Sequence, residues 1–115
     1  MMYKVREFAE ITGLSRETLR YYAEVGLLEP AYIDPENRYR YYDDGSYFLA
    51  SLLVKLRSFG FSIQEMSEVM RDESFENLEA MLKQKRQKIL NEIEEMKAKI
   101  EEIDQFLESG KDDEM

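Results

Sequence analysis

Apolar residues near the N-terminus recur at helical spacing and predict two short helices joined by a tight turn. The apolar face of the first helix consists of Val5, Phe8, Ala9 and Ile11. Gly13 ends this helix, and Ser15 provides an N-cap for a second helix that runs from about Arg16 to Glu24 or Val25. Two such helices form a candidate helix-turn-helix.

The second predicted helix separates a core face from an outer face. Its core face consists of Leu19, Tyr22 and Ala23, which share one arc at about 100° per residue. Arg16, Arg20 and Tyr21 occupy the outer arc. Arg16 and Arg20 lie four residues apart and repel each other, so a phosphate or base edge beside them would be stabilising. The alternative is a solvated face on which Arg20 pairs with Glu24.

An extended segment, a turn and an aromatic strand predict a β-hairpin over residues 31–42. The turn is Asp34-Pro35-Glu36-Asn37, because Pro presets the backbone at its second position. The return strand alternates, with Arg38, Arg40 and Tyr42 on one side and Tyr39 and Tyr41 on the other. Two arginines on one side suit a DNA backbone or minor groove. The alternative is a hairpin whose tyrosines cover a small core, and we expect Tyr39 and Tyr41 to do so in either case.

Two further helices are predicted after the hairpin. The third helix begins after Asp43 or Asp44 and ends at Gly60, with an apolar stripe that leaves Phe48 outside it. Ser62-Ile-Gln-Glu65 is a capping box and starts a short fourth helix.

A final long helix is predicted from a cap at Ser74, through Phe75 in its first turn, to about Leu107. Its apolar residues form a narrow seam interrupted by Lys85 and Arg86: Leu82, Ile89, Ile93, Met96, Ile100, Ile103 and Leu107. From Ile89 the spacing alternates between four and three, which is typical of a coiled coil. The simplest partner is a second copy of the helix, and the alternative is that the helix folds back on its own domain. Residues 109–115 are polar and are predicted to be a disordered tail.

The charge of the chain is unevenly distributed. The formal net charge is -9, but residues 1–60 hold eight Lys/Arg against nine Asp/Glu, whereas residues 61–115 hold eight against sixteen. The near-neutral first half lacks the basic excess of many nucleic-acid binders. Local clustering still provides phosphate contacts, and seven of the eight tyrosines fall among these arginines, between Tyr21 and Tyr47.

Composition excludes several classes of site. The chain has no Cys and no His, which excludes disulfides, thiolate or imidazole metal sites, and Cys or His catalysis. No nucleophile–base pair and no phosphate-cradling glycine loop is present, so we expect neither an enzyme nor a cofactor. No signal peptide or membrane-length apolar run is present, so a cytoplasmic protein with no membrane partner is expected.

Several motifs in order along the chain resemble the MerR family of bacterial transcription regulators. These motifs are Tyr3-Lys-Val, Thr12-Gly-Leu-Ser15, Thr18-Leu-Arg-Tyr-Tyr22, Gly26-Leu-Leu-Glu-Pro30, Tyr39-Arg-Tyr-Tyr42 and Leu56-Arg-Ser-Phe-Gly-Phe-Ser62. The hairpin, which corresponds to the wing of the family, is most similar to that of the BmrR-type multidrug-sensing branch.

The resemblance implies a mainly α fold, in which a winged helix-turn-helix domain with a small β-hairpin wing occupies residues 1–72 and a coiled-coil dimerisation helix residues 74–108. Such proteins bind a two-fold promoter operator as homodimers, through an antiparallel coiled coil, and bend and untwist the DNA so that RNA polymerase can engage it. The expected location is then the bacterial cytoplasm, associated with the nucleoid when bound to DNA. A second hypothesis is a coiled-coil interaction module that pairs with another regulator or a polymerase subunit.

The resemblance also implies which residues contact double-stranded promoter DNA. They are Lys4, Ser15, Arg16, Thr18, Arg20, Tyr21, Arg38, Tyr39, Arg40 and Arg57. Among them, Arg16 and Thr18 are expected near the major groove, and Arg40 and Arg57 at the backbone.

Three differences from the family pattern change the expectations. Arg38 stands where the wing tip usually carries Gly, so Asn37 is expected to take the left-handed turn position. Gly45 and Ser46 weaken the start of the third helix. The absence of cysteine excludes the metal-sensing and redox-sensing branches.

Multidrug-sensing members carry a large C-terminal ligand domain, so a small lipophilic effector is expected only where the full protein has such a domain.

Overall fold

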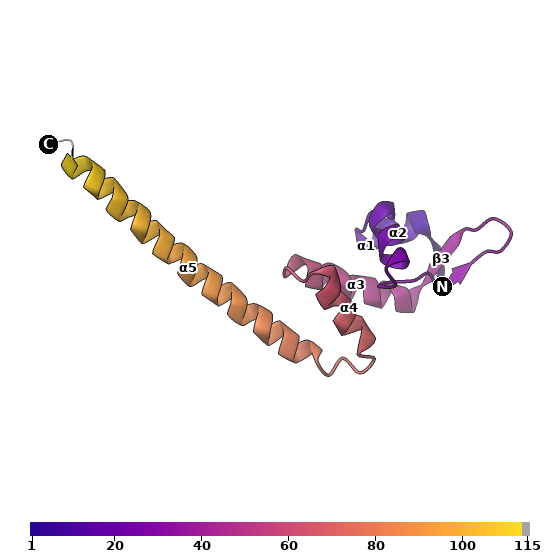
Figure 1. The fold of residues 1–115 in the computed structure, drawn as a ribbon. Helices are drawn as coiled ribbons and strands as arrows, with labels where there is room; N and C mark the ends of the chain where they lie inside the picture. Colours follow the sequence, from indigo (N-terminus) through magenta and orange to yellow (C-terminus); the bar gives the residue numbers. More distant parts are fainter. Residues whose placement is uncertain (114–115) are drawn as a thin grey trace. The chain divides into compact units, whose positions relative to one another are not determined.

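The computed structural model describes residues 1–113. Its elements follow in the order β1 (Met2–Lys4), α1 (Val5–Thr12), α2 (Arg16–Glu24), β2 (Tyr32–Ile33), β3 (Arg40–Asp43), α3 (Asp44–Ser58), α4 (Ile63–Arg71) and α5 (Leu78–Asp113) (Figure 1). Two compact units result, Met1–Phe75 and the chain from Glu76 onward. The mainly helical fold with a small antiparallel sheet and a long C-terminal helix is the predicted one. None of the described helices is both long and apolar enough to cross a membrane.

The helix-turn-helix forms where local signals predict it. Gly13 ends α1 in the left-handed conformation, with φ of 79°, which only glycine adopts without strain. The Ser15 hydroxyl accepts a hydrogen bond of 3.0 Å from the backbone N–H of Thr18 and starts α2. Leu19 and Tyr22 are buried on the predicted core face, while Tyr21 points outward and is 47% exposed.

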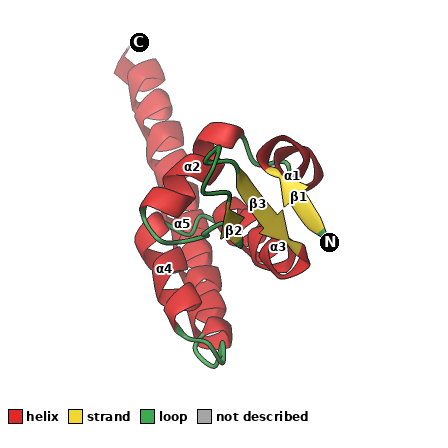
Figure 2. Cartoon of the chain, turned by 90° about the vertical axis from the view of Figure 1, so that its right-hand side faces the viewer, coloured by secondary structure: helices red, strands yellow, loops and turns green. Residues whose placement is uncertain are grey.

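The small sheet contains one strand that the sequence pattern does not reveal. β3 lies in the centre, with β1 and β2 antiparallel on its two sides, and Tyr3 pairs with Tyr42. Figure 2 shows the three strands beside α1 and α3. β1 has only three residues, too few for a recognisable alternation, and it forms because β3 supplies its hydrogen-bond partners.

The wing, meaning β2, β3 and the loop between them, faces the core with the side opposite to the prediction. Tyr42 is fully buried and its ring stacks on Phe8 at 4.3 Å between centroids. Tyr39 is 58% exposed, and Tyr41 is half-buried against Tyr32. The expectation that Tyr39 and Tyr41 cover the core is therefore wrong. Strand alternation separates two sides but does not tell which side meets the rest of the domain.

The tip of the wing also differs from the expectation. Arg38, not Asn37, takes the left-handed position, with φ of 64°. Asn37 instead accepts a hydrogen bond of 2.9 Å from the Tyr39 N–H, and Arg38 N–H donates to the Asp34 carbonyl at 2.8 Å. Because the turn uses Arg38, the return strand begins at Arg40 and not at the predicted Arg38.

The third and fourth helices begin at the predicted caps. Asp43 accepts hydrogen bonds from the Ser46 N–H at 2.8 Å and from its hydroxyl at 2.9 Å, so it holds the start of α3 despite Gly45. The Ser62–Glu65 capping box starts α4, with both hydrogen bonds present. Phe48 is 67% exposed, as its position outside the apolar stripe predicts.

Replacing Asp43 with Ala should lower the melting temperature near neutral pH and make it less dependent on pH. Hydrogen bonds from Ser46 hold the pKa of Asp43 below its ordinary value. A carboxyl group whose pKa is lower in the folded than in the unfolded protein stabilises the fold at pH values above its unfolded-state pKa. This stabilisation is lost as the pH falls through the pKa of the folded state. Thermal melts of both proteins from pH 7 down to acid should therefore converge. Asp43→Asn is the control, since its amide oxygen keeps the cap without titrating; a gap that stays constant at all pH values would contradict the assignment.

The long helix α5 begins later and ends later than predicted. Ser74 is not its cap: the Ser74 hydroxyl donates to Asp72 at 2.7 Å, and Phe75 takes a left-handed conformation with φ of 58°. The helix begins at Leu78 and continues to Asp113, so residues 109–113 are helical where a disordered tail was expected. One exposed glycine, Gly110, weakens a helix by only about 1 kcal/mol and does not end it. Residues 114–115 of the predicted tail lie outside the described residues.

The apolar seam, meaning Ile89, Ile93, Met96, Ile100, Ile103 and Leu107, is exposed along α5. Leu82, the first predicted dimerisation residue, is half-buried. The residues of the seam form a continuous apolar stripe along the helix.

Candidate nucleic-acid interface

A groove rich in cations joins the start of α1, the outer face of α2 and the wing. It has a volume of about 810 Å³ and we call it the basic groove. Its lining residues are Lys4, Val5, Arg6, Arg16, Arg20, Arg38, Tyr39 and Arg40. Six of the eight are Lys or Arg and none is acidic, so a chain with a net negative charge presents a concentrated positive surface here.

The arginines of α2 are available to a ligand. Arg16 and Arg20 are exposed on the outer face of α2, and both line the groove. Within residues 1–113, no ion pair joins Arg20 to Glu24, so the solvated pair considered above does not form. Arg6 is the groove cation with an acidic partner, at 3.9 Å from Glu10, and that pair is exposed and weak.

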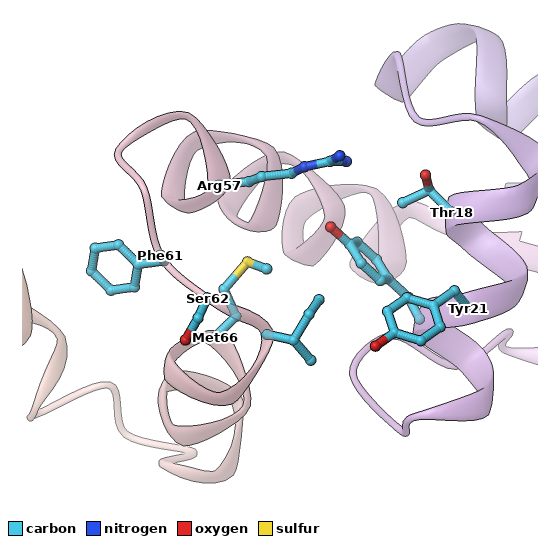
Figure 3. A pocket seen from close by; sticks show the side chains of 8 residues that line it. Thr18, Tyr21, Arg57, Phe61, Ser62 and Met66 are labelled. Carbon is cyan, nitrogen blue, oxygen red and sulfur yellow. The ribbon is translucent and has the colours of Figure 1, made fainter.

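A second, smaller pocket of about 350 Å³ lies where α2 approaches α3 and α4. Thr18 and Tyr21 line it from α2, and Arg57 extends toward them from α3 (Figure 3). Phe61 and Met66 form its apolar side. Arg57 therefore lies beside α2, although it follows Arg20 by 37 positions in the sequence.

The predicted contact residues thus divide into two neighbouring groups that share α2. Lys4, Arg16, Arg20, Arg38, Tyr39 and Arg40 line the basic groove, and Thr18, Tyr21 and Arg57 line the second pocket. Ser15 lines neither; its hydroxyl is engaged with the backbone and side chain of Thr18. Sequence reasoning missed Arg6, whose one available signal is that Lys4 and Arg6 flank the first residue of α1.

The described residues hold no cluster of three or more Asp or Glu able to bind a metal ion. The lining of the basic groove is dominated by arginine and lysine, which suits an extended polyanion.

A comparison with protein-family models identifies residues 3–73 as a MerR HTH family regulatory protein. The chain belongs to this family. The match covers both helix-turn-helix helices, the wing, α3 and α4, which are the elements that line the basic groove and the second pocket. Membership in a family of regulators agrees with the expectation that the chain is not an enzyme.

Individual relatives agree with this assignment. The chain is 30% identical over 96 residues to the Multidrug-efflux transporter 1 regulator of Bacillus subtilis, covering 84% of this chain and 34% of that protein. It thus spans about a third of the length of this curated relative. Its fold is similar to the crystal structure of MtaN, the N-terminus of the Bacillus subtilis Multidrug Transporter Activator, with a TM-score of 0.83, 28% identity, and coverage of 91% of this chain and 97% of that one.

A third similarity concerns a protein bound to DNA. HiNmlR, a MerR family regulator lacking the sensor domain and bound to promoter DNA, matches with a TM-score of 0.63 and 26% identity, over 88% of this chain and 80% of that chain.

Proposed function

We propose that this chain is a sequence-specific DNA-binding transcription regulator that binds a two-fold promoter operator as a homodimer. The observation that carries the proposal is the basic groove, whose six cations come from β1, α1, α2 and the wing. Membership in the MerR family and the promoter-bound structure of HiNmlR support it.

The arrangement of cations suits one strand of a duplex lying between α2 and the wing. Exposed arginines on α2 place donors at the major groove, and a wing that carries Arg38 and Arg40 reaches the adjacent backbone. Arg57, at the second pocket, extends the row of cations past Thr18 and Tyr21. In this proposal phosphate contacts set the position of the protein, while side chains of α2 read base edges.

The second half of the operator requires a second copy of the chain, and the apolar seam of α5 supplies the interface. In an antiparallel pair, a and d positions meet across the interface. We align the two antiparallel helices so that Ala98 of one copy is level with Ala98 of the other. Ile89 then faces Leu107 of the other copy, Ile93 faces Ile103, and Met96 faces Ile100. Arg86 then faces Gly110, where the missing side chain leaves room for it.

Regulation in this proposal comes from deforming the promoter. The two basic grooves of the dimer engage both half-sites on DNA that is bent and untwisted, a deformation that costs on the order of 1–10 kcal/mol. The cation–phosphate contacts of the two grooves offset this cost, and the altered promoter becomes a substrate for RNA polymerase. A small lipophilic effector belongs to the proposal only where a longer protein carries a sensor domain.

Titrating the chain onto a duplex from its own upstream promoter region tests the proposal directly. Fluorescence anisotropy should show binding at low salt, and log K should fall linearly with log salt, by about 0.9 per phosphate contact. A scrambled duplex of the same length is the control and should bind more weakly. Absence of binding at low salt, or an affinity that does not respond to salt, would contradict the proposal.

The second candidate function, a coiled-coil module that pairs with another regulator or a polymerase subunit, rests on the same exposed seam. Sedimentation equilibrium separates the two. A dimer supports the operator-binding homodimer, whereas a stable monomer supports a heteromeric module.

A further inference from the structure

Among the buried side-chain polar atoms of the N-terminal unit, the hydroxyl oxygen of Tyr42 has no partner in hydrogen-bond geometry. The residue is fully buried, and no group lies within hydrogen-bond distance and geometry of this oxygen. Buried hydroxyls in native proteins are nearly always paired, so an unpaired one calls for an explanation.

Packing of the ring does not explain why residue 42 is tyrosine and not phenylalanine. The Tyr42 ring lies nearly parallel to that of Phe8, with 7° between the planes, and fills the space between the sheet and α1. A phenylalanine would make the same stack and bury the same ring without leaving a polar atom unpaired. The oxygen therefore lowers stability in the free protein.

The charged neighbour of this hydroxyl is Arg40. Arg40 and Tyr42 are two residues apart on β3, so their side chains lie on the same face of the sheet. Burial raises the pKa of Tyr42, and both the charge of Arg40 and a side-chain interaction with it oppose that rise, in keeping with a guanidinium beside the phenol. Arg40 is half-buried and lines the basic groove, so it connects the buried hydroxyl with the proposed DNA surface.

We propose that Tyr42 is a positioning residue for Arg40 in DNA recognition. When a phosphate enters the basic groove, the guanidinium turns so that one N–H donates to the Tyr42 hydroxyl and others donate to the phosphate. Arg has five N–H donors in a planar group, enough for both partners at once. The inference rests on the proposed function, because it is a DNA phosphate in the basic groove that holds the guanidinium where it donates a hydrogen bond of good geometry to the Tyr42 hydroxyl.

Tyr42→Phe tests the inference, because its effects on stability and on binding have opposite directions. The melting temperature should stay the same or rise, since the buried oxygen is removed. Operator affinity should fall roughly 100-fold, the size expected when each copy of the dimer loses one hydrogen bond to a charged group. Tyr41→Phe is the matched control: Tyr41 is the next residue on β3, lies on the opposite face, and does not line the basic groove.

A double-mutant cycle with Arg40→Ala, measured at low salt where weak binding remains detectable, isolates the pair. In the Arg40→Ala background, Tyr42→Phe should leave affinity unchanged. The inference is overturned when Tyr42→Phe leaves affinity unchanged in the native background, when its effect persists without Arg40, or when affinity and melting temperature fall together. Binding by the unmodified chain in the same assay tests the proposed function separately.

Discussion

Ile100→Asp should abolish dimer formation and operator binding together. Ile100 is 58% exposed on α5 and lies within the apolar seam, at a position that in the proposed dimer is covered by Met96 of the other copy. The substitution occurs in both copies and places two carboxylates in an apolar interface, at a cost of several kcal/mol each. Sedimentation equilibrium should then give a monomer, and the same protein should bind the two-fold operator no better than a scrambled duplex.

Ala98→Asp is the matched control for this prediction. Ala98 is exposed two residues earlier on the same helix, on the side opposite the seam, so the same charge there should leave both dimer and binding intact. Circular dichroism should show that both variants retain their helices. If the Ile100→Asp protein remains a dimer, the apolar seam is not the interface. If the Ala98→Asp protein is a monomer, added negative charge alone separates the copies.

Arg20→Ala should weaken operator binding roughly 100-fold or more without changing the fold. Arg20 is exposed in the basic groove and has no ion-pair partner among residues 1–113, so we expect the variant to keep its fold. A hydrogen bond to a charged group contributes about 1.5–3 kcal/mol, and the dimer loses it twice. Anisotropy titrations over a range of salt concentrations measure the loss.

The salt dependence of Arg20→Ala indicates what the side chain contacts. A slope shallower by about 2 assigns one phosphate per copy to Arg20, whereas an unchanged slope assigns a base edge. Arg71→Ala is the control, because Arg71 is exposed at the end of α4 and lines neither the basic groove nor the second pocket. An equal loss of affinity in both variants would show that the effect comes from net charge and not from the groove.

Where the sequence predicts helices correctly, the signals are local. Gly13, Ser15, Asp43 and the Ser62–Glu65 capping box each act on backbone groups within a few residues, and the helices begin and end there. The predicted start of α5 is wrong because it also relied on a local signal, one that the structure uses differently. Ser74 satisfies the pattern of a cap, but its hydroxyl bonds to Asp72, which precedes it, and the chain turns at Phe75 before the helix begins.

The site was predictable as a set of residues but not as a surface. The family resemblance implies Arg16, Arg20 and Arg40 as contact residues, and the structure places all three in the basic groove. Arg6 joins them only because β1 pairs with β3 and brings the start of α1 beside the wing. No spacing along the chain encodes that pairing.

By itself the sequence determined the helix-turn-helix, the capped third and fourth helices, the apolar seam and the residue types of a polyanion-binding surface, because caps and helical periodicity act over one or two turns. Only the tertiary structure decided that Tyr42 and not Tyr41 enters the core, that Arg38 makes the wing turn, and that six cations share one groove. Each of those outcomes depends on strand pairing and on which side of β3 meets α1. Such contacts join residues far apart in the chain, and an alternating strand is equally compatible with either side.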